Sequence, residues 1–251
     1  MNTPIAPTSF ADTFVDASTA RIPSSEPRRE TFREPPAPHD QRALGGTVIG
    51  RDHGLREQNP SILALRSELR LGWFNGGDRK SLAIVSADPR DRNPPVAAQL
   101  AVACAAAGDR TLLIDANMRE PSLHTLFGIE KALGLSAVLS NNISLRGALL
   151  PTRFDTLSVL PAGPSIAHPE ALLSLSKLTH LIEEASRSFD LILIDTPCMS
   201  MYGDAQVVAR AAGGALVTVR RHHTTAAALS RLATDLNSTG TAVVGALFVD
   251  S

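Results

Sequence analysis

Two aspartates, Asp115 and Asp195, each end a short run of apolar, mostly branched residues. Asp195 lies in FDLILIDTP (residues 189–197) and Asp115 lies in RTLLIDA (residues 110–116). A run that is apolar at nearly every position is typical of a central parallel strand with helices on both faces. Open α/β sheets bind ligands at the carboxyl ends of such strands. The pair therefore indicates a magnesium–nucleotide site, and the competing interpretation is that each aspartate only caps the turn that follows it.

The segment SADPRDRNPPVAAQLA (residues 86–101) stands where a phosphate-binding loop belongs, after a strand and before a helix rich in small residues. Such a loop needs glycines that let backbone N–H groups surround a phosphate, followed by lysine and by serine or threonine. This segment has no glycine and no lysine, and Pro94 and Pro95 carry no N–H where the helix should offer donors. Arg90 and Arg92 could hold a phosphate as fixed charges, but not as a backbone nest. The segment predicts that tight binding of ATP phosphates is lost.

Apolar strands alternate with helical patterns along the rest of the chain. This alternation predicts an α/β fold with a doubly wound, mainly parallel sheet and helices on both faces, as in P-loop NTPases. Strands are expected at residues 80–87, 110–116, 156–160, 189–197, 214–219 and 241–249, and helices at residues 59–74, 96–107, 144–150, 169–186 and 224–238.

The N-terminal part has a different composition. Eight of the 17 prolines lie in the first 60 residues, among serine, threonine, arginine and glutamate. Such a segment has little to bury against the entropy of ordering its backbone, so residues 1–55 are predicted to be a disordered, proline-rich tail and residues 56–251 the folded domain. The tail is either a tether or docking segment, or an extension without a role.

Charge and cysteine content narrow the class of protein. The net charge of −1 creates no overall field that would attract nucleic acid. The two cysteines, Cys104 and Cys198, lie far apart in apolar surroundings and read as reduced core residues rather than a disulfide framework. With no apolar stretch of membrane-spanning length, we expect a cytoplasmic protein that contacts a membrane only through a partner.

Several motifs, in order, resemble the bacterial exopolysaccharide tyrosine autokinases, specifically the EpsG-like chain-length determinant branch. That family lies within the ParA/MinD-type group of deviant P-loop ATPases. The resemblance covers roughly residues 61–250. It rests on ALRSELRLGWF (64–74), TLLIDANMREPSLHTLFG (111–128), GLSAVLSNN (134–142), LSVLPAGPSIAHPEALL (157–173), FDLILIDTP (189–197) and GDAQVVARAAGGALVTVRR (203–221).

The resemblance implies roles for individual residues. Asp115 matches the second Walker-type aspartate, a ligand of magnesium-bound water and a base. Asp195 matches the Walker B aspartate, which holds the magnesium shell, so ATP and Mg²⁺ are the implied cofactors. Arg119 matches an arginine that follows the second motif. The implied partners are the membrane chain-length determinant protein of the export system and an active kinase paralogue.

The chain departs from the family pattern at its first motif. Asn93 stands where the family has lysine or arginine, Pro94 where it has serine or threonine, and Arg90 and Arg92 where it has glycines. Tyr202 is the single tyrosine of the chain, whereas these autokinases carry a cluster of tyrosines at the C-terminus. Of the Glu-x-x-Arg-x-x-Arg positions on the first helix, at residues 60, 63 and 66, only Arg66 is kept.

Two functional hypotheses remain open. One is an active ATP-dependent tyrosine kinase or ATPase of exopolysaccharide chain-length control, which the two aspartates favour. The other is a non-catalytic regulatory relative, a pseudokinase, which the altered loop, the missing tyrosine cluster and the altered first helix favour. A septum-positioning or partition ATPase of the MinD/ParA type is a third hypothesis, which the segments at residues 64–70 and 161–173 disfavour.

Overall fold

The computed structural model describes residues 14–15, 60–75, 78–91, 94–129, 132–221 and 223–249. Apart from Phe14–Val15, the segment predicted to be a disordered tail lies outside these residues. The tail and the domain boundary at residue 55 therefore stay predictions.

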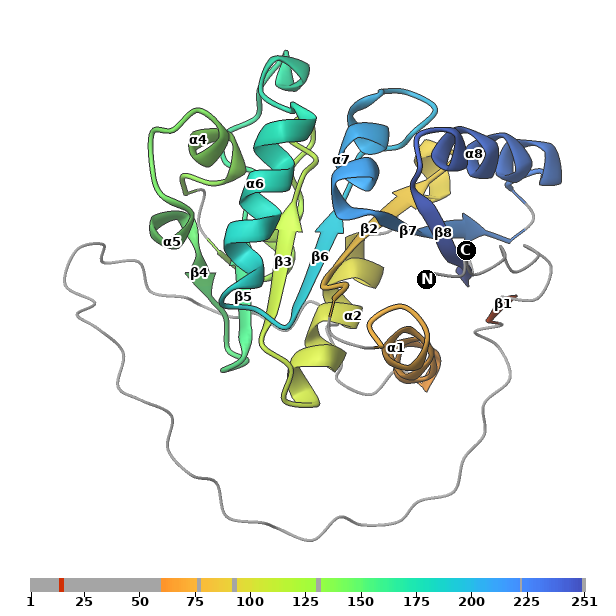
Figure 1. The fold of residues 1–251 in the computed structure, drawn as a ribbon, viewed down its shortest axis with the longest axis horizontal. Coiled ribbons are helices and arrows are strands. Elements are labelled where there is room, and N and C mark those ends of the chain that lie inside the picture. Colours follow the sequence, from red (N-terminus) through yellow and green to blue (C-terminus); the bar gives the residue numbers. More distant parts are fainter. Residues whose placement is uncertain are drawn as a thin grey trace, which may run out of the picture.

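A single sheet of eight strands organises the fold (Figure 1), in the order β1-β8-β7-β2-β6-β3-β5-β4. Every neighbouring pair is parallel except β4 and β5. The mainly parallel, doubly wound sheet expected from the sequence is thus confirmed. The strands are β1 (Phe14–Val15), β2 (Ser81–Ser86), β3 (Thr111–Asp115), β4 (Leu150–Pro151), β5 (Leu157–Leu160), β6 (Leu191–Asp195), β7 (Gly214–Arg220) and β8 (Ala242–Val249).

Helices cover both faces of the sheet, as Figure 1 shows for α6 and α7 on one face and α2 on the other. Side chains alternate along each strand, so Ala83 and Val85 of β2 join one buried cluster while Leu82 and Ile84 join the other. The longer helices are α1 (Pro60–Leu71), α2 (Pro94–Ala106), α6 (Leu175–Ser186), α7 (Asp204–Ala212) and α8 (Ala226–Ser238). Short helices are α3 (Leu123–Leu126), α4 (Leu135–Leu139), α5 (Leu145–Ala148), η2 (Pro89–Asp91) and η3 (Pro169–Ala171).

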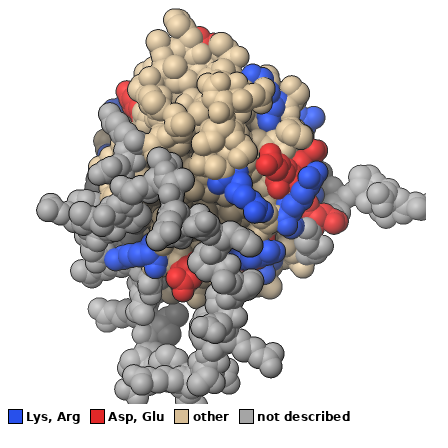
Figure 2. Space-filling model, turned by 90° about the vertical axis from the view of Figure 1, so that its left-hand side faces the viewer, with Lys and Arg blue, Asp and Glu red and all other residues tan. Residues whose placement is uncertain are grey.

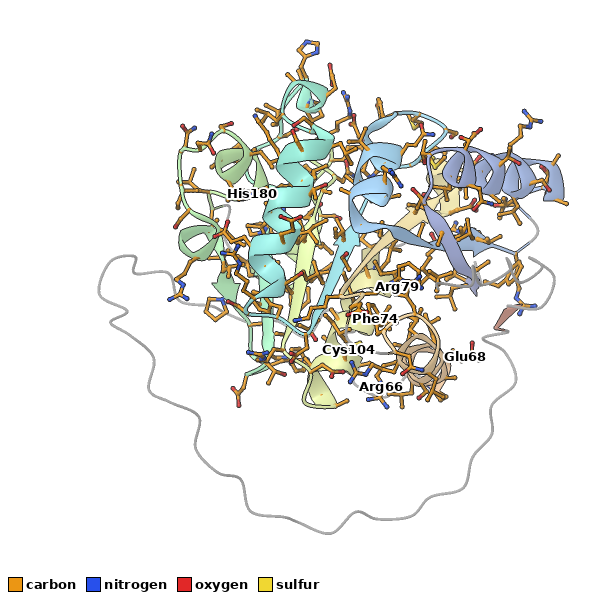
Figure 3. All side chains as sticks on the ribbon, viewed as in Figure 1. Arg66, Glu68, Phe74, Arg79, Cys104 and His180 are labelled. Atoms are coloured by element: carbon orange, nitrogen blue, oxygen red, sulfur yellow. The ribbon has the colours of Figure 1, made fainter. Side chains whose placement is uncertain are left out.

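The layer of α1 and α2 holds one of the two cysteines. Cys104 of α2 and Phe74, just after α1, belong to the same buried cluster (Figure 3). Burial raises the pKa of the Cys104 thiol to about 12, so the thiol stays neutral at physiological pH. Cys198 is also free and buried. Both cysteines are therefore small core residues, as expected.

Two expected helices differ from the structure. The helix expected at 169–186 is divided into η3 and α6, because the Ser174 side chain accepts a hydrogen bond from Lys177 N and caps a new helix start. The helix expected at 144–150 ends at Ala148, and Leu150–Pro151 pair with β5 instead. Both patterns are apolar at helical spacing, but capping and sheet pairing decide the outcome.

The charged side chains visible in the view of the β4 side of the molecule carry both signs. In Figure 2, lysine and arginine side chains lie among aspartate and glutamate side chains, in agreement with the net charge of −1. None of the helices among the described residues combines the length and the hydropathy that a bilayer crossing requires.

An ion pair joins the amino ends of β3 and β6. Arg110 Nη2 lies 2.7 Å from Asp190 Oδ1, and Arg110 Nε and N both donate to Asp190 Oδ2. The hydrogen bond from the Arg110 side chain lowers the pKa of Asp190 to about 2. Both side chains are more than a third exposed, so the pair contributes less than about 1 kcal/mol.

This ion pair predicts a pH-dependent contribution to stability. The folded-state pKa of Asp190 lies below its unfolded value of about 3.9, so the contribution is present above that value and is lost as the pH falls towards 2. Asp190→Asn is expected to lower the melting temperature slightly at neutral pH. The difference from the parent protein should narrow between about pH 4 and pH 2. A difference that stays constant down to the lower pH would contradict this assignment.

Candidate functional site

The strand register brings Asp115 and Asp195 side by side. They are direct partners across the parallel β3–β6 pair, and their residues are 0% and 2% exposed. Leu113 and Leu193, two residues earlier on each strand, belong to the cluster under α1 and α2. Because residues two apart share a face, both carboxylates lie on the α2 side of the sheet. The predicted convergence of the two aspartates at one sheet edge is what the topology produces.

Two hydroxyl groups extend this arrangement along the sheet. Ser86 and Thr218 are partners across β2 and β7, and each lies two residues after a member of the α1/α2 cluster, Ile84 and Leu216. We refer to Asp115, Asp195, Ser86 and Thr218 as the polar row. All four residues are buried, at the carboxyl ends of neighbouring strands. Sequence reasoning missed the two hydroxyl residues, because a serine or threonine at a strand end carries no distinctive signal.

The carboxylate of Asp115 is engaged by the loop that follows its strand. Asp115 Oδ1 accepts a hydrogen bond from Asn117 N at 3.1 Å. Oδ2 accepts from Ser122 N at 3.0 Å and from Leu123 N at 3.1 Å, at the start of α3. Three backbone donors thus point at one buried carboxylate, which is the arrangement that the capping interpretation predicts for Asp115.

In the loop between β2 and α2, oppositely charged side chains of the loop pair with each other. Arg90 Nε and N both donate to Asp88 Oδ1 at 2.9 Å, and Arg90 Nη2 donates to Oδ2 at 3.2 Å. The Arg90 side-chain hydrogen bond lowers the pKa of Asp88 to about 2. Arg92 and Asn93, also predicted to face a nucleotide, lie outside the described residues, and Pro94 is the first residue of α2. Arg90 therefore pairs with its own loop.

Asp91 fastens the same loop to the connection between β7 and α8. The residue is 0% exposed; its Oδ1 accepts from Arg220 N at 3.0 Å, and its Oδ2 accepts a hydrogen bond from the Thr224 hydroxyl. The backbone oxygen of Asp91 accepts from Thr218 Oγ1 at 3.1 Å. The sequence analysis did not single out this residue. An aspartate between two arginines looks like surface charge until its distant partners are known.

Arg119 joins three loops at the same end of the sheet. Its Nε donates to Asp204 Oδ2 at 3.0 Å, its Nη2 to Glu170 Oε2 at 2.6 Å and its Nη1 to Ala167 O at 3.0 Å. Its guanidinium also lies 4.2 Å from the centroid of the Tyr202 ring. The hydrogen bond to Asp204, followed by that to Glu170, holds the pKa of Arg119 above its usual range. The predicted neighbour of a nucleotide is here bound to three protein acceptors and lies over an aromatic ring.

A magnesium ion at the two aspartates would draw most of its ligands from phosphate and water. Magnesium in nucleotide sites takes one or two carboxylates together with phosphate oxygens and water. Three backbone donors engage Asp115, a carboxylate with about four lone-pair sites, and among the described residues no group of three or more His, Cys, Asp and Glu side chains could hold a metal. The hydroxyl of Ser86, in the same polar row, is buried and has no hydrogen-bond partner in the described part of the chain.

No model of a known protein family matches the chain. Individual relatives do. Tyrosine-protein kinase YwqD of Bacillus subtilis is 36% identical over 140 residues, which cover 56% of this chain and 59% of YwqD. The putative tyrosine-protein kinase CapB of Staphylococcus aureus is 32% identical over 168 residues, 67% of this chain and 74% of CapB. The putative tyrosine-protein kinase AmsA of Erwinia amylovora is 31% identical over 80% of this chain, but only 28% of AmsA is matched.

The comparison with solved structures also finds a bacterial tyrosine kinase domain. The kinase domain of the Escherichia coli tyrosine kinase ETK has a TM-score of 0.71 and 28% identity, with 75% of this chain and 74% of that domain covered. The septum site-determining protein MinD of Pyrococcus horikoshii, solved with Mg-ADP, has a TM-score of 0.60 at 22% identity, over 68% of this chain and 70% of MinD. The second likeness shows the P-loop NTPase fold alone. With the coverage of CapB, these comparisons show that the chain belongs to the family of bacterial tyrosine-protein kinases.

Proposed function

We propose that this chain is a regulatory, non-catalytic member of its family, with an impaired or lost ATP site. The observation that carries the proposal is the loop between β2 and α2, which Asp91 fastens to Arg220 and Thr224. The loop offers prolines at the start of α2, where a phosphate would need N–H donors.

The pathway proposed for the chain is exopolysaccharide biosynthesis and the control of polysaccharide chain length. The motif resemblance to exopolysaccharide autokinases supports this pathway. The proposed partners are the membrane chain-length determinant protein and an active kinase paralogue. In AmsA, the region similar to this chain is a minor part of a longer protein, which is consistent with a domain that works beside another one. The proposed location is the cytoplasm, at the inner membrane through such a partner.

An active ATP-dependent tyrosine kinase is the second candidate. Two observations favour it: Asp115 and Asp195 lie side by side, and the buried Ser86 hydroxyl of the same row has no hydrogen-bond partner among the described residues. A MinD-type positioning ATPase shares the fold, but no contact among the described residues of the site favours it over the other two.

Calorimetric titration of the purified chain with Mg-ADP and with a non-hydrolysable ATP analogue tests the proposal. We expect no binding heat even at millimolar nucleotide, because the loop is already bound to protein groups. Asp195→Ala serves as the site variant, and Asp190→Asn, which changes a carboxylate at the opposite, amino end of the same strand, is the matched control. Micromolar binding that Asp195→Ala abolishes and Asp190→Asn keeps would overturn the proposal in favour of the active kinase.

A further inference from the structure

A pocket lies at the amino edge of the sheet, away from the polar row. It has a volume of about 560 Å³, and its walls come from the chain just before β2 and from the ends of α6, α7 and α8. Ser81 in its wall and Ser86 in the polar row are the first and last residues of β2, so about 17 Å separate the two places. The pocket is therefore distinct from the candidate nucleotide site.

Three helices present their carboxyl ends to this pocket. Ser186 is the last residue of α6, Ala212 is the last residue of α7, and Gly240 follows the end of α8 by two residues. The last carbonyl groups of a helix carry partial negative charge and favour cations. Lys80 Nζ donates to Ser186 O at 2.7 Å. Arg210 Nη1 donates to Gly240 O at 3.0 Å. The backbone around the pocket thus already attracts positively charged groups.

Two carboxylates of the pocket lack a cation. Asp78 and Glu183 are both exposed, and among the described residues neither side chain has an ion pair or a hydrogen bond. Lys80 lies in the same pocket, but its ammonium group donates to Ser186 O and Phe189 O instead. The two carboxylates can therefore receive a cation that the described part of the chain does not supply.

The indole ring of Trp73 forms an aromatic wall of the pocket. Its Nε1 donates to Ser81 O at 2.9 Å, and a Cβ at Gly214 would lie only 2.3 Å from its Cζ2, so the ring is fixed in place. The guanidinium of Arg79, which Figure 3 labels, lies 4.4 Å from the ring centroid. Arg79 is exposed and has no ion pair among the described residues. A cation–π contact at an exposed position is weak, so another guanidinium can replace that of Arg79.

We propose that this pocket binds an arginine side chain of a partner protein, and that Arg79 occupies the place of that side chain in the free chain. The incoming guanidinium stacks on Trp73 and pairs with the carboxylates that Arg79 leaves unpaired. Arginine suits the pocket better than lysine, because its planar cation stacks on an aromatic face and donates to a carboxylate at the same time. The site requires neither nucleotide nor kinase activity, so it is independent of the proposed function.

A short peptide tests the site in the full chain. The probe is Gly-Gly-Arg-Gly-Gly with both ends blocked, and its matched control carries citrulline, which has the shape of arginine without the charge. Trp73 is the single tryptophan of the chain, so its fluorescence and the NMR signal of its indole N–H report on this pocket. At constant ionic strength, we expect the arginine peptide to shift both signals with a dissociation constant on the order of 10 mM. The citrulline peptide should leave them unchanged at the same concentrations.

Four substitutions of exposed residues separate the proposed roles. Arg79→Ala removes the internal competitor and should tighten binding of the arginine peptide about threefold. Arg187→Ala, at an exposed arginine outside the pocket, should leave the affinity unchanged. Glu183→Gln removes one of the carboxylates and should weaken binding about threefold. Glu184→Gln makes the same change at the exposed neighbour outside the pocket and should have no effect.

Four results would overturn the proposal. One is the absence of a saturable shift of the Trp73 signals in both the parent chain and Arg79→Ala at up to about 100 mM peptide. A second is an equal dissociation constant for the arginine and citrulline peptides. A third is weaker binding in Arg79→Ala, because Arg79 would then hold the ligand instead of competing with it. The fourth is an equal effect of Glu183→Gln and Glu184→Gln, which would make long-range charge rather than the pocket responsible.

Discussion

Asp115→Ala is expected to lower the free energy of unfolding by about 3–4 kcal/mol, the largest loss among the single substitutions considered for this site. The substitution leaves the backbone N–H groups of Asn117, Ser122 and Leu123 without their acceptor at a position that is 0% exposed. Hydrogen bonds to a charged group contribute about 1.5–3 kcal/mol each, and bonds that share one carboxylate do not add fully. Urea unfolding followed by circular dichroism measures the loss.

Two further variants show what the Asp115 result means. Asp115→Asn keeps one carbonyl oxygen as acceptor, so its loss should be about half as large. Asp88→Ala removes a carboxylate of the neighbouring loop that is 33% exposed and paired with Arg90, and its loss should stay below about 1 kcal/mol. If the free energy of unfolding of Asp115→Ala lies within about 1 kcal/mol of that of the parent protein, the three contacts do not stabilise the fold. The carboxylate would then be kept for a ligand, as the kinase hypothesis requires.

Asp91→Ala is expected to lower the free energy of unfolding by about 2–3 kcal/mol and to release the loop between β2 and α2. The substitution leaves Arg220 N and the Thr224 hydroxyl without their acceptor, while the contact of Thr218 with the Asp91 backbone remains. The release has its own measurement, because the loop contains two trypsin cleavage positions, Arg90 and Arg92. We expect tryptic cleavage there to accelerate in the variant under native conditions.

A double-mutant cycle separates the fastening of the loop from a general loss of stability. Thr224→Val removes the hydroxyl that donates to Asp91 and nearly keeps the side-chain volume. If the two groups act through one contact, the double variant Asp91→Ala/Thr224→Val should lose less than the sum of the single losses. Additive losses, or cleavage of the loop no faster than in the parent protein, would show that Asp91 does not fasten it.

The positions of Asp115 and Asp195 illustrate what local sequence can determine. Each aspartate follows a run of branched apolar residues, and such a run suits a buried strand wherever it lies in the chain. Parallel strands in a doubly wound sheet end at the same edge, so the topology alone brings the two carboxylates together. The absence of glycine from residues 86–95 is likewise visible in the sequence, because a backbone nest for phosphate depends on residue type and not on partners.

The partners of these residues are decided by the tertiary structure. Asp91 meets Thr224 across 133 positions, and Arg119 meets Asp204 across 85. Contacts over such separations follow from strand order and register, which no local pattern contains. The start of α6 at Ser174 and the pairing of β1 with β8 also depend on neighbours that sequence spacing does not reveal. The sequence by itself thus determined the family, the sheet and the edge at which the aspartates lie. Only the tertiary structure decided that backbone donors engage Asp115 and that Asp91 fastens the loop, because a buried carboxylate takes whatever donors the packed chain brings to it.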